Sequence, residues 1–175
     1  MRFTIVLRTR VPVGSGAAEQ IRGNSELQSQ LAALHAVTGK HYSQGNNLII
    51  GETKFTSILP IAWVCSVEII LVRATPNTNI SGLADIDNTL KTLFDALCAP
   101  AGGSSPKDTP YKDTRFVVAL EDKQFSSVTA SSDHHWGAKS EDDLTIIRVV
   151  TQETPIDDLV SLGGQSFTTV RKNVF

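Results

Sequence analysis

The sequence predicts an α+β fold, with a mixed sheet of about five or six strands and two or three helices. Apolar runs rich in β-branched residues recur along the chain, which is typical of strands. Two other stretches place apolar residues at helical spacing. The length of 175 residues and the hydrophobic content of 41% suffice for one folded domain with an ordinary core.

The expected strands are identified by alternation of apolar and polar residues or by short continuous apolar runs. They cover residues 3–8, 47–57, 63–72, 124–130 and 144–150. Residues 115–120 are expected to form either a further strand or a turn. The sequence from 131 to 142 is polar and is expected to be a loop.

The expected helices are identified by capping residues and by the spacing of apolar residues. Asn24 or Ser25 is suited to cap a first helix that runs to about Val37. A second helix carries a single apolar stripe and ends before Pro100. The stripe consists of Ile86, Leu90, Leu93, Phe94 and Leu97. A short helix is also expected around residues 156–162.

The organisation predicted is one domain over residues 1–150, followed by a C-terminal extension over residues 151–175. No apolar run approaches the ~20 residues that a membrane-spanning helix needs, and the N-terminus lacks a signal-peptide pattern. We therefore expect a cytoplasmic protein with no membrane partner. Cys65 and Cys98 are expected to be buried thiols, because two distant cysteines do not make a structural zinc site.

The charge balance limits the classes of partner. The net charge is −2 and the pI is about 6.1. Proteins that bind nucleic acid are usually basic. A role on DNA therefore requires a local basic patch, a metal ion or a partner protein.

Carboxylates gather where the second helix begins. Asp85 and Asp87 stand two residues apart, and Lys91 follows Asp87 by one helical turn. Two such aspartates point to the same side if Asp85 is extended and the helix starts at or after Asp87. This pattern suggests the start of a metal site that needs a third carboxylate, and Asp122 in the segment LEDKQF offers one.

Simpler interpretations of the same residues remain open. Asp87 is a suitable helix N-cap, worth ~1 kcal/mol. Asp87 and Lys91 also have the spacing of an ion pair on one helix face, worth ~0.3–0.5 kcal/mol. The pair His134-His135 offers metal ligands by residue type, but its polar surroundings favour a solvated loop.

The pattern D-x-D-N-x-x-K-x-x-x-D-A-L, from Asp85 to Leu97, resembles the signature of the RusA family of Holliday junction resolvases. A second family element, a paired acid before a polar-apolar run, resembles the segment from Glu121 to Phe125. The opening strand and the strand at 144–150 occur in the matching order. The resemblance covers roughly residues 1–150, and the helix motif is its specific part.

The resemblance implies a small bacterial or phage endonuclease. Members are homodimers with a mixed α/β fold that cut four-way DNA junctions by Mg²⁺-dependent phosphodiester hydrolysis. Their three essential aspartates match Asp85, Asp87 and Asp122, and their essential lysine matches Lys91. Two alternatives remain: a RusA-fold module that binds nucleic acid or protein without cutting, and a related flap or fork endonuclease.

Overall fold

The computed structural model describes residues 1–38, 47–75, 86–100, 113–136 and 143–153. These residues form three α-helices, one 3₁₀ helix and seven strands in two sheets, so the α+β prediction is confirmed. The helices are α1 (Ala17–Arg22), α2 (Ser25–Thr38), α3 (Ile86–Leu97) and the 3₁₀ helix η2 (Asp122–Gln124). The strands are β1 (Arg2–Leu7), β2 (Asn47–Ile50), β3 (Thr53–Ser57), β4 (Trp63–Thr75), β5 (Thr114–Val117), β6 (Phe125–Trp136) and β7 (Leu144–Glu153).

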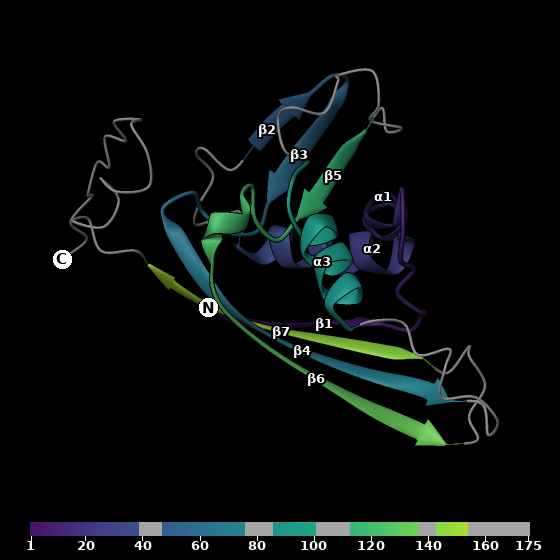
Figure 1. The fold of residues 1–175 in the computed structure, drawn as a ribbon. Coiled ribbons are helices and arrows are strands. Elements are labelled where there is room, and N and C mark those ends of the chain that lie inside the picture. Colours follow the sequence, from purple (N-terminus) through teal and green to yellow (C-terminus); the bar gives the residue numbers. More distant parts are fainter. Residues whose placement is uncertain (39–46, 76–85, 101–112, 137–142, 154–175) are drawn as a thin grey trace.

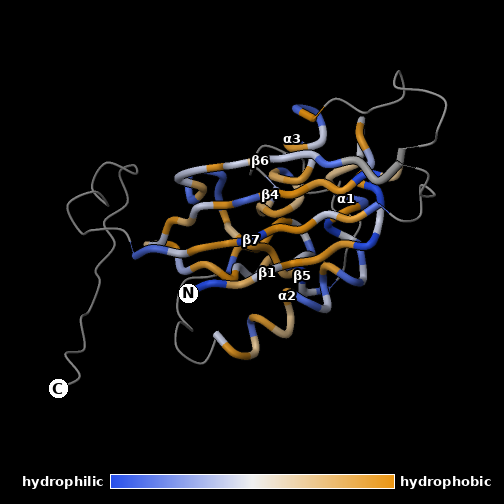
Figure 2. The backbone as a smooth tube through the Cα atoms, turned by 90° about the horizontal axis from the view of Figure 1, so that it is seen from below, coloured by the Kyte–Doolittle hydropathy of each residue, from blue (hydrophilic) through white to orange (hydrophobic). Residues whose placement is uncertain are grey.

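The larger sheet has the strand order β1-β7-β4-β6, and the smaller sheet has the order β2-β3-β5. In the larger sheet, β4 pairs with β6 in parallel, and the other neighbours are antiparallel. In the smaller sheet β3 and β5 are parallel. Figure 1 shows the three helices and the smaller sheet on one side of the larger sheet. Figure 2, seen from below, shows the other side of the larger sheet without a helix over it.

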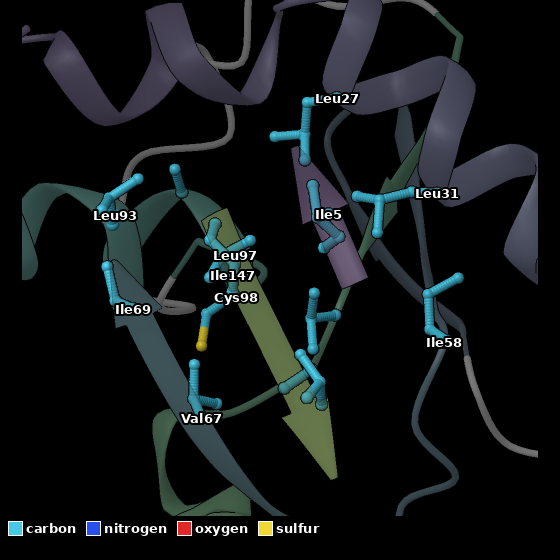
Figure 3. Packing of buried hydrophobic residues seen from close by; sticks show 14 of the residues in the cluster. Ile5, Leu27, Leu31, Ile58, Val67, Ile69, Leu93, Leu97, Cys98 and Ile147 are labelled. Carbon is cyan, nitrogen blue, oxygen red and sulfur yellow. The ribbon is translucent and has the colours of Figure 1, made fainter. Parts of the chain in front are cut away.

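The main core lies between the larger sheet and the helices. Alternate residues of the central strands, such as Val67 and Ile69, point toward the helices and are buried. Leu27 of α2 and Leu93 of α3 belong to the same cluster, in which Leu93 lies near Ile69 and Leu27 lies near Ile5 of β1 (Figure 3). Burial of each such side chain contributes about 1.5–3 kcal/mol. This packing fixes α3 on the sheet.

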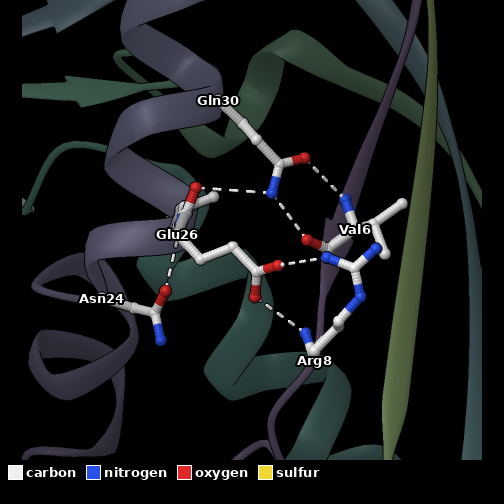
Figure 4. Close-up of polar contacts among 6 residues, drawn as sticks. Val6, Arg8, Asn24, Glu26 and Gln30 are labelled. Carbon is white, nitrogen blue, oxygen red and sulfur yellow. Dashed lines mark hydrogen bonds and ion pairs between the residues drawn. The ribbon is translucent and has the colours of Figure 1, made fainter.

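Two glutamine side chains of helix α2 form hydrogen bonds with the backbone at one edge of each sheet. Gln30 accepts a hydrogen bond from the N–H of Val6 at 2.9 Å and donates one to its carbonyl at 2.6 Å, in place of a neighbouring strand (Figure 4). Gln28 does the same for Phe116 of β5, with both bonds at 2.9 Å. The side chains thereby occupy the outer edge of β1 at Val6 and that of β5 at Phe116.

Arg22 at the end of α1 is buried and holds the far end of α3. Its Nε donates to the carbonyl of Cys98 at 3.3 Å, and its guanidinium also bonds the carbonyl of Asp95 and the carboxylate of Glu19. Carbonyls at a helix end lack partners within the helix, and a cation there is favourable. Arg22 therefore fixes the position at which α3 stops.

The structure confirms several predicted elements. Helix α2 begins where expected, with Asn24 as its cap, since the Asn24 carboxamide accepts from the N–H of Leu27 at 3.0 Å. Helix α3 and β7 also fall where their patterns place them. Cys65 and Cys98 are both buried and not disulfide-bonded.

Other expectations were wrong in detail. Residues 47–57 form two antiparallel strands, because the chain turns at Gly51 with a φ of 59°. The loop expected from residue 131 is wrong as far as Trp136, because β6 continues along β4 to that point. Thus His134 and His135 belong to a strand. Helix α1 was not expected.

Strand β7 extends past residue 150, where the expected domain ends. β7 pairs with β4 up to Glu153, so residues 151–153 belong to the sheet and not to an extension. The rest of the proposed extension and the short helix around 156–162 lie outside the described residues. None of the described helices is long and apolar enough to cross a membrane.

Candidate active site at helix α3

Asp87 and Lys91 lie on the exposed side of α3, one helical turn apart. Asn88 and Asp95 are exposed as well, whereas Leu93 on the opposite side is fully buried. The apolar stripe forces this orientation, since it must face the sheet. The first two turns of α3 therefore present a carboxylate and an ammonium group together at the surface.

Asp85 lies outside the described residues. The described helix begins at Ile86, one residue earlier than convergence of Asp85 with Asp87 requires. Asp87 is thus inside the first turn and is not the N-cap residue. A carboxylate there interacts favourably with the partial positive charge of the helix N-terminus.

The first turn of α3 rests on Arg73 near the end of β4. Arg73 is buried, and its Nη2 donates to Oγ1 of Thr89 at 2.8 Å. The carboxylate of Asp143 lies nearby, where it accepts from the N–H of Ala74 at 2.8 Å and faces Arg10 Nε at 3.8 Å. Burial lowers the pKa of Arg73, while the charge of Asp143 opposes that shift. These groups fix the helix start against the strand end.

The sequence prediction missed this support. The expected strand over residues 63–72 ends just before Arg73, which in the structure still belongs to β4, and Asp143 has no predicted role. The available signal was a single arginine directly after the apolar run that ends at Val72. A buried arginine needs paired acceptors, which makes such a position a candidate for a fixed polar network.

Asp122 is exposed and belongs to η2, which the side chain of Gln124 holds in place. Gln124 is buried, and its Oε1 accepts from the N–H of Leu120 at 2.9 Å. Its Nε2 donates to the carbonyls of Pro60 and Trp63 at 3.0 and 3.1 Å. η2, and Asp122 with it, is therefore fixed beside the start of β4.

Asp122 lies near the end of α3 and Asp87 near its beginning. Three residues after Asp122, the ring of Phe125 packs on Phe94 with the centroids 5.2 Å apart. Burial raises the pKa of Cys98, which follows α3, to about 12, and the charge of Asp122 adds to the shift.

The length of α3 separates the two carboxylates. The rise of an α-helix puts the two ends of α3 about 15 Å apart. Since ligands of Mg²⁺ lie at about 2.0–2.1 Å from the ion, one chain does not bring Asp87 and Asp122 to a shared cation. The described residues, which do not include Asp85, contain no group of three or more His, Cys, Asp or Glu side chains that could hold a metal.

The donor chemistry at Asp87 fits a hard cation, because Mg²⁺ prefers carboxylate oxygens and keeps several waters. The described residues of one chain supply only part of such a ligand set. Lys91 beside Asp87 is suited to a phosphate oxygen as a mobile point charge.

Comparison with known proteins adds no further assignment. No protein-family model, no curated protein and no solved structure matches the chain. The resemblance to the RusA family stays a prediction that rests on the residue patterns given above.

Proposed function

We propose that this protein is a Mg²⁺-dependent endonuclease that cuts four-way DNA junctions. The observation that carries the proposal is the exposed pair Asp87 and Lys91 on the first two turns of α3, within the pattern D-x-D-N-x-x-K. The buried contact between Arg73 and Thr89 supports it, because a site must be held rigidly to act on a phosphate.

Each residue has a distinct task in this proposal. Asp87 holds the cation through its carboxylate oxygens, and in this proposal Asp85 reaches the same ion from the residue just before the described helix. Lys91 binds a non-bridging oxygen of the scissile phosphate and stabilises the charge that develops there. When bound, Mg²⁺ supplies neutralisation of phosphate charge and makes a water molecule more acidic.

The proposed functional unit is a homodimer in which the partner's Asp122 completes the ligand set. The reason is the separation of about 15 Å that α3 imposes between its two ends within one chain. A third carboxylate beside Asp85 and Asp87 also makes the cation necessary, because uncompensated like charges at close range repel. The net charge of −2 further favours a cation as the link to DNA.

The direct test is cleavage of a synthetic four-way junction with labelled strands. We expect cuts with Mg²⁺ and none with EDTA. Asp85→Asn, Asp87→Asn and Asp122→Asn should each abolish cutting, while Asp95→Asn, an exposed aspartate on the same helix, should retain it. Full activity of Asp87→Asn, or equal activity in EDTA, would contradict the proposal.

Lys91→Ala tests the phosphate contact separately. We expect the rate of cleavage to fall by about 10²-fold or more, in the range of lost electrostatic stabilisation, with a smaller change in junction affinity. Normal turnover by this variant would remove Lys91 from the mechanism.

The same assays distinguish the proposed junction nuclease from two alternative functions. A RusA-fold module that only binds would retain junction affinity and show no cutting at any Mg²⁺ concentration. The separation of Asp87 from Asp122 within one chain favours this alternative if the protein is monomeric. A flap or fork endonuclease would prefer those substrates to four-way junctions in a parallel panel.

A further inference from the structure

Strand β6 forms one edge of the larger sheet, and its outer side is open in the described part of the molecule. The opposite edge, β1, differs, because Gln30 and Glu26 of α2 bond its outer backbone at Val6 and Arg8. No side chain takes this role along residues 126–132 among the described contacts. β6 thus offers backbone donors and acceptors over several residues.

The composition of β6 leaves this edge unprotected. From Phe125 to Ser132 the strand has no charged residue and no proline, the devices that usually prevent pairing at an edge. Residues 126–131 are all exposed, so both faces of the strand are accessible here. Among them Val128 is 44% exposed, so the accessible part of the strand includes an apolar side chain. These features favour a further strand as the neighbour of β6.

We propose that β6 pairs antiparallel with β6 of a second copy, which joins two larger sheets into one. This inference rests on the proposed function, since it names the contact through which the second copy reaches the site. A second copy is the occupant favoured here, because α3 keeps Asp122 away from Asp87 in one chain.

The strand registers show how the pairing brings the partner's Asp122 to the site. β6 runs parallel to β4, with Phe125 beside Cys65 and His134 beside Arg73. In an antiparallel pair the start of one β6 lies beside the end of the other. The partner's Phe125 then reaches the level of Arg73, on which the first turn of α3 rests through Thr89.

The symmetry of such a pair defines its centre. Residues opposite each other in antiparallel strands point to the same face, and the two-fold axis is perpendicular to the sheet. Pairing the full length of β6 puts the axis at or next to Ala130. The helices of both copies then lie on the same side of the joined sheet. The N-terminal end of each α3 and the partner's η2 therefore lie on the same surface.

A charge at the axis tests the contact. Ala130→Glu places two carboxylates opposite each other, which destabilises a strand pair. Thr4→Glu on β1 is the matched control, because Thr4 is also an exposed residue of an edge strand. By sedimentation velocity we expect the wild type and Thr4→Glu to be dimers, and Ala130→Glu to dissociate with at least a tenfold weaker dimer affinity.

A cysteine at the same position gives a second readout. Opposed residues in antiparallel strands have Cα atoms about 4.5–5.5 Å apart, within the range of a disulfide. The natural thiols Cys65 and Cys98 are buried, so an exposed cysteine is the reactive one. Ala130→Cys should form a covalent dimer under mild oxidation, and Thr4→Cys should not.

The possible outcomes test the proposed interface and the proposed nuclease function independently. A monomeric wild type, or a dimer that Ala130→Glu leaves intact and Ala130→Cys fails to cross-link, would overturn the proposed pairing. Junction cutting by a protein whose dimer does not depend on β6 would reject only the interface. A β6-dependent dimer that cuts no junction would reject only the nuclease function.

Discussion

Arg73 on β4 donates a hydrogen bond to Thr89 on α3 across 2.8 Å, and both side chains are buried. The bond joins the end of a strand to the first turn of the helix that carries Asp87 and Lys91. It ties this turn of the helix to the sheet. Its removal should therefore affect stability and the site together.

Thr89→Val removes the acceptor without changing the size of the side chain much. We expect a loss of about 1–3 kcal/mol in unfolding free energy, because a buried donor of Arg73 is left without this partner. Urea denaturation measures it. Thr92→Val is the control, since the Thr92 hydroxyl donates to the Asn88 carbonyl of its own helix. An equal cost in both variants would show that the contact between strand and helix adds nothing.

Gln124→Ala should loosen η2 and move Asp122. The change leaves the backbone groups of Leu120, Pro60 and Trp63 without the side chain that bonds them, so we expect a cost of about 2–4 kcal/mol. Denaturation and junction cleavage measure the two effects. Lys123→Ala, at the exposed neighbouring residue, should change stability by less than about 0.5 kcal/mol. Unaltered stability of Gln124→Ala would rule out this anchoring role.

Gln30→Ala should open the outer edge of β1. The N–H and carbonyl of Val6 lose the side chain that replaces a strand, at a cost of about 1–2 kcal/mol. An unprotected edge also promotes association of chains. We expect a lower melting temperature and concentration-dependent light scattering. Gln20→Ala, at an exposed residue of α1, is the control and should show neither effect.

The buried thiols predict loss of stability at alkaline pH. Burial raises the pKa of Cys65 and of Cys98 from 9.0 to about 12. Above pH 9 the unfolded chain releases these protons and the folded chain retains them, so unfolding becomes more favourable as the pH rises from 9 to 12. Below pH 9 both states keep the thiol protons and this effect is absent.

Cys65→Ala should reduce the alkaline slope of the unfolding free energy relative to wild type, whatever its cost at pH 7. Native protein should also react slowly with a thiol reagent at pH 8, and unfolded protein rapidly. An unchanged slope between pH 9 and 11 would contradict the assignment of Cys65 as a buried neutral thiol.

The sequence predicted the elements that local pattern determines. The stripe of α3 and the apolar run of β7 each identify their element without tertiary contacts. Helix α1 has only six residues, too few for a clear period, and depends on Arg22 meeting the end of α3. The later part of β6 is polar, and it is a strand because β4 beside it supplies the ladder.

The sequence predicted the part of the candidate site that lies on a single helix, α3. The spacing of Asp87 and Lys91 determines that they share a face, because helical geometry is local. The position of Asp122 depends on Gln124 and on the contact of Phe125 with Phe94, which join segments distant in sequence. Local spacing contains no information about such contacts. The placement of Asp122 at the end of α3 away from Asp87 was therefore known only from the structure.

The most direct test of a junction nuclease with a shared site is to refold Asp87→Asn and Asp122→Asn together in equal amounts and assay cleavage. Each variant alone should be inactive. In a mixed dimer one site combines the intact Asp87 of one copy with the partner's intact Asp122, so about a quarter of the wild-type sites should recover. A mixture as inactive as its components, although mixed dimers have formed, would contradict the account.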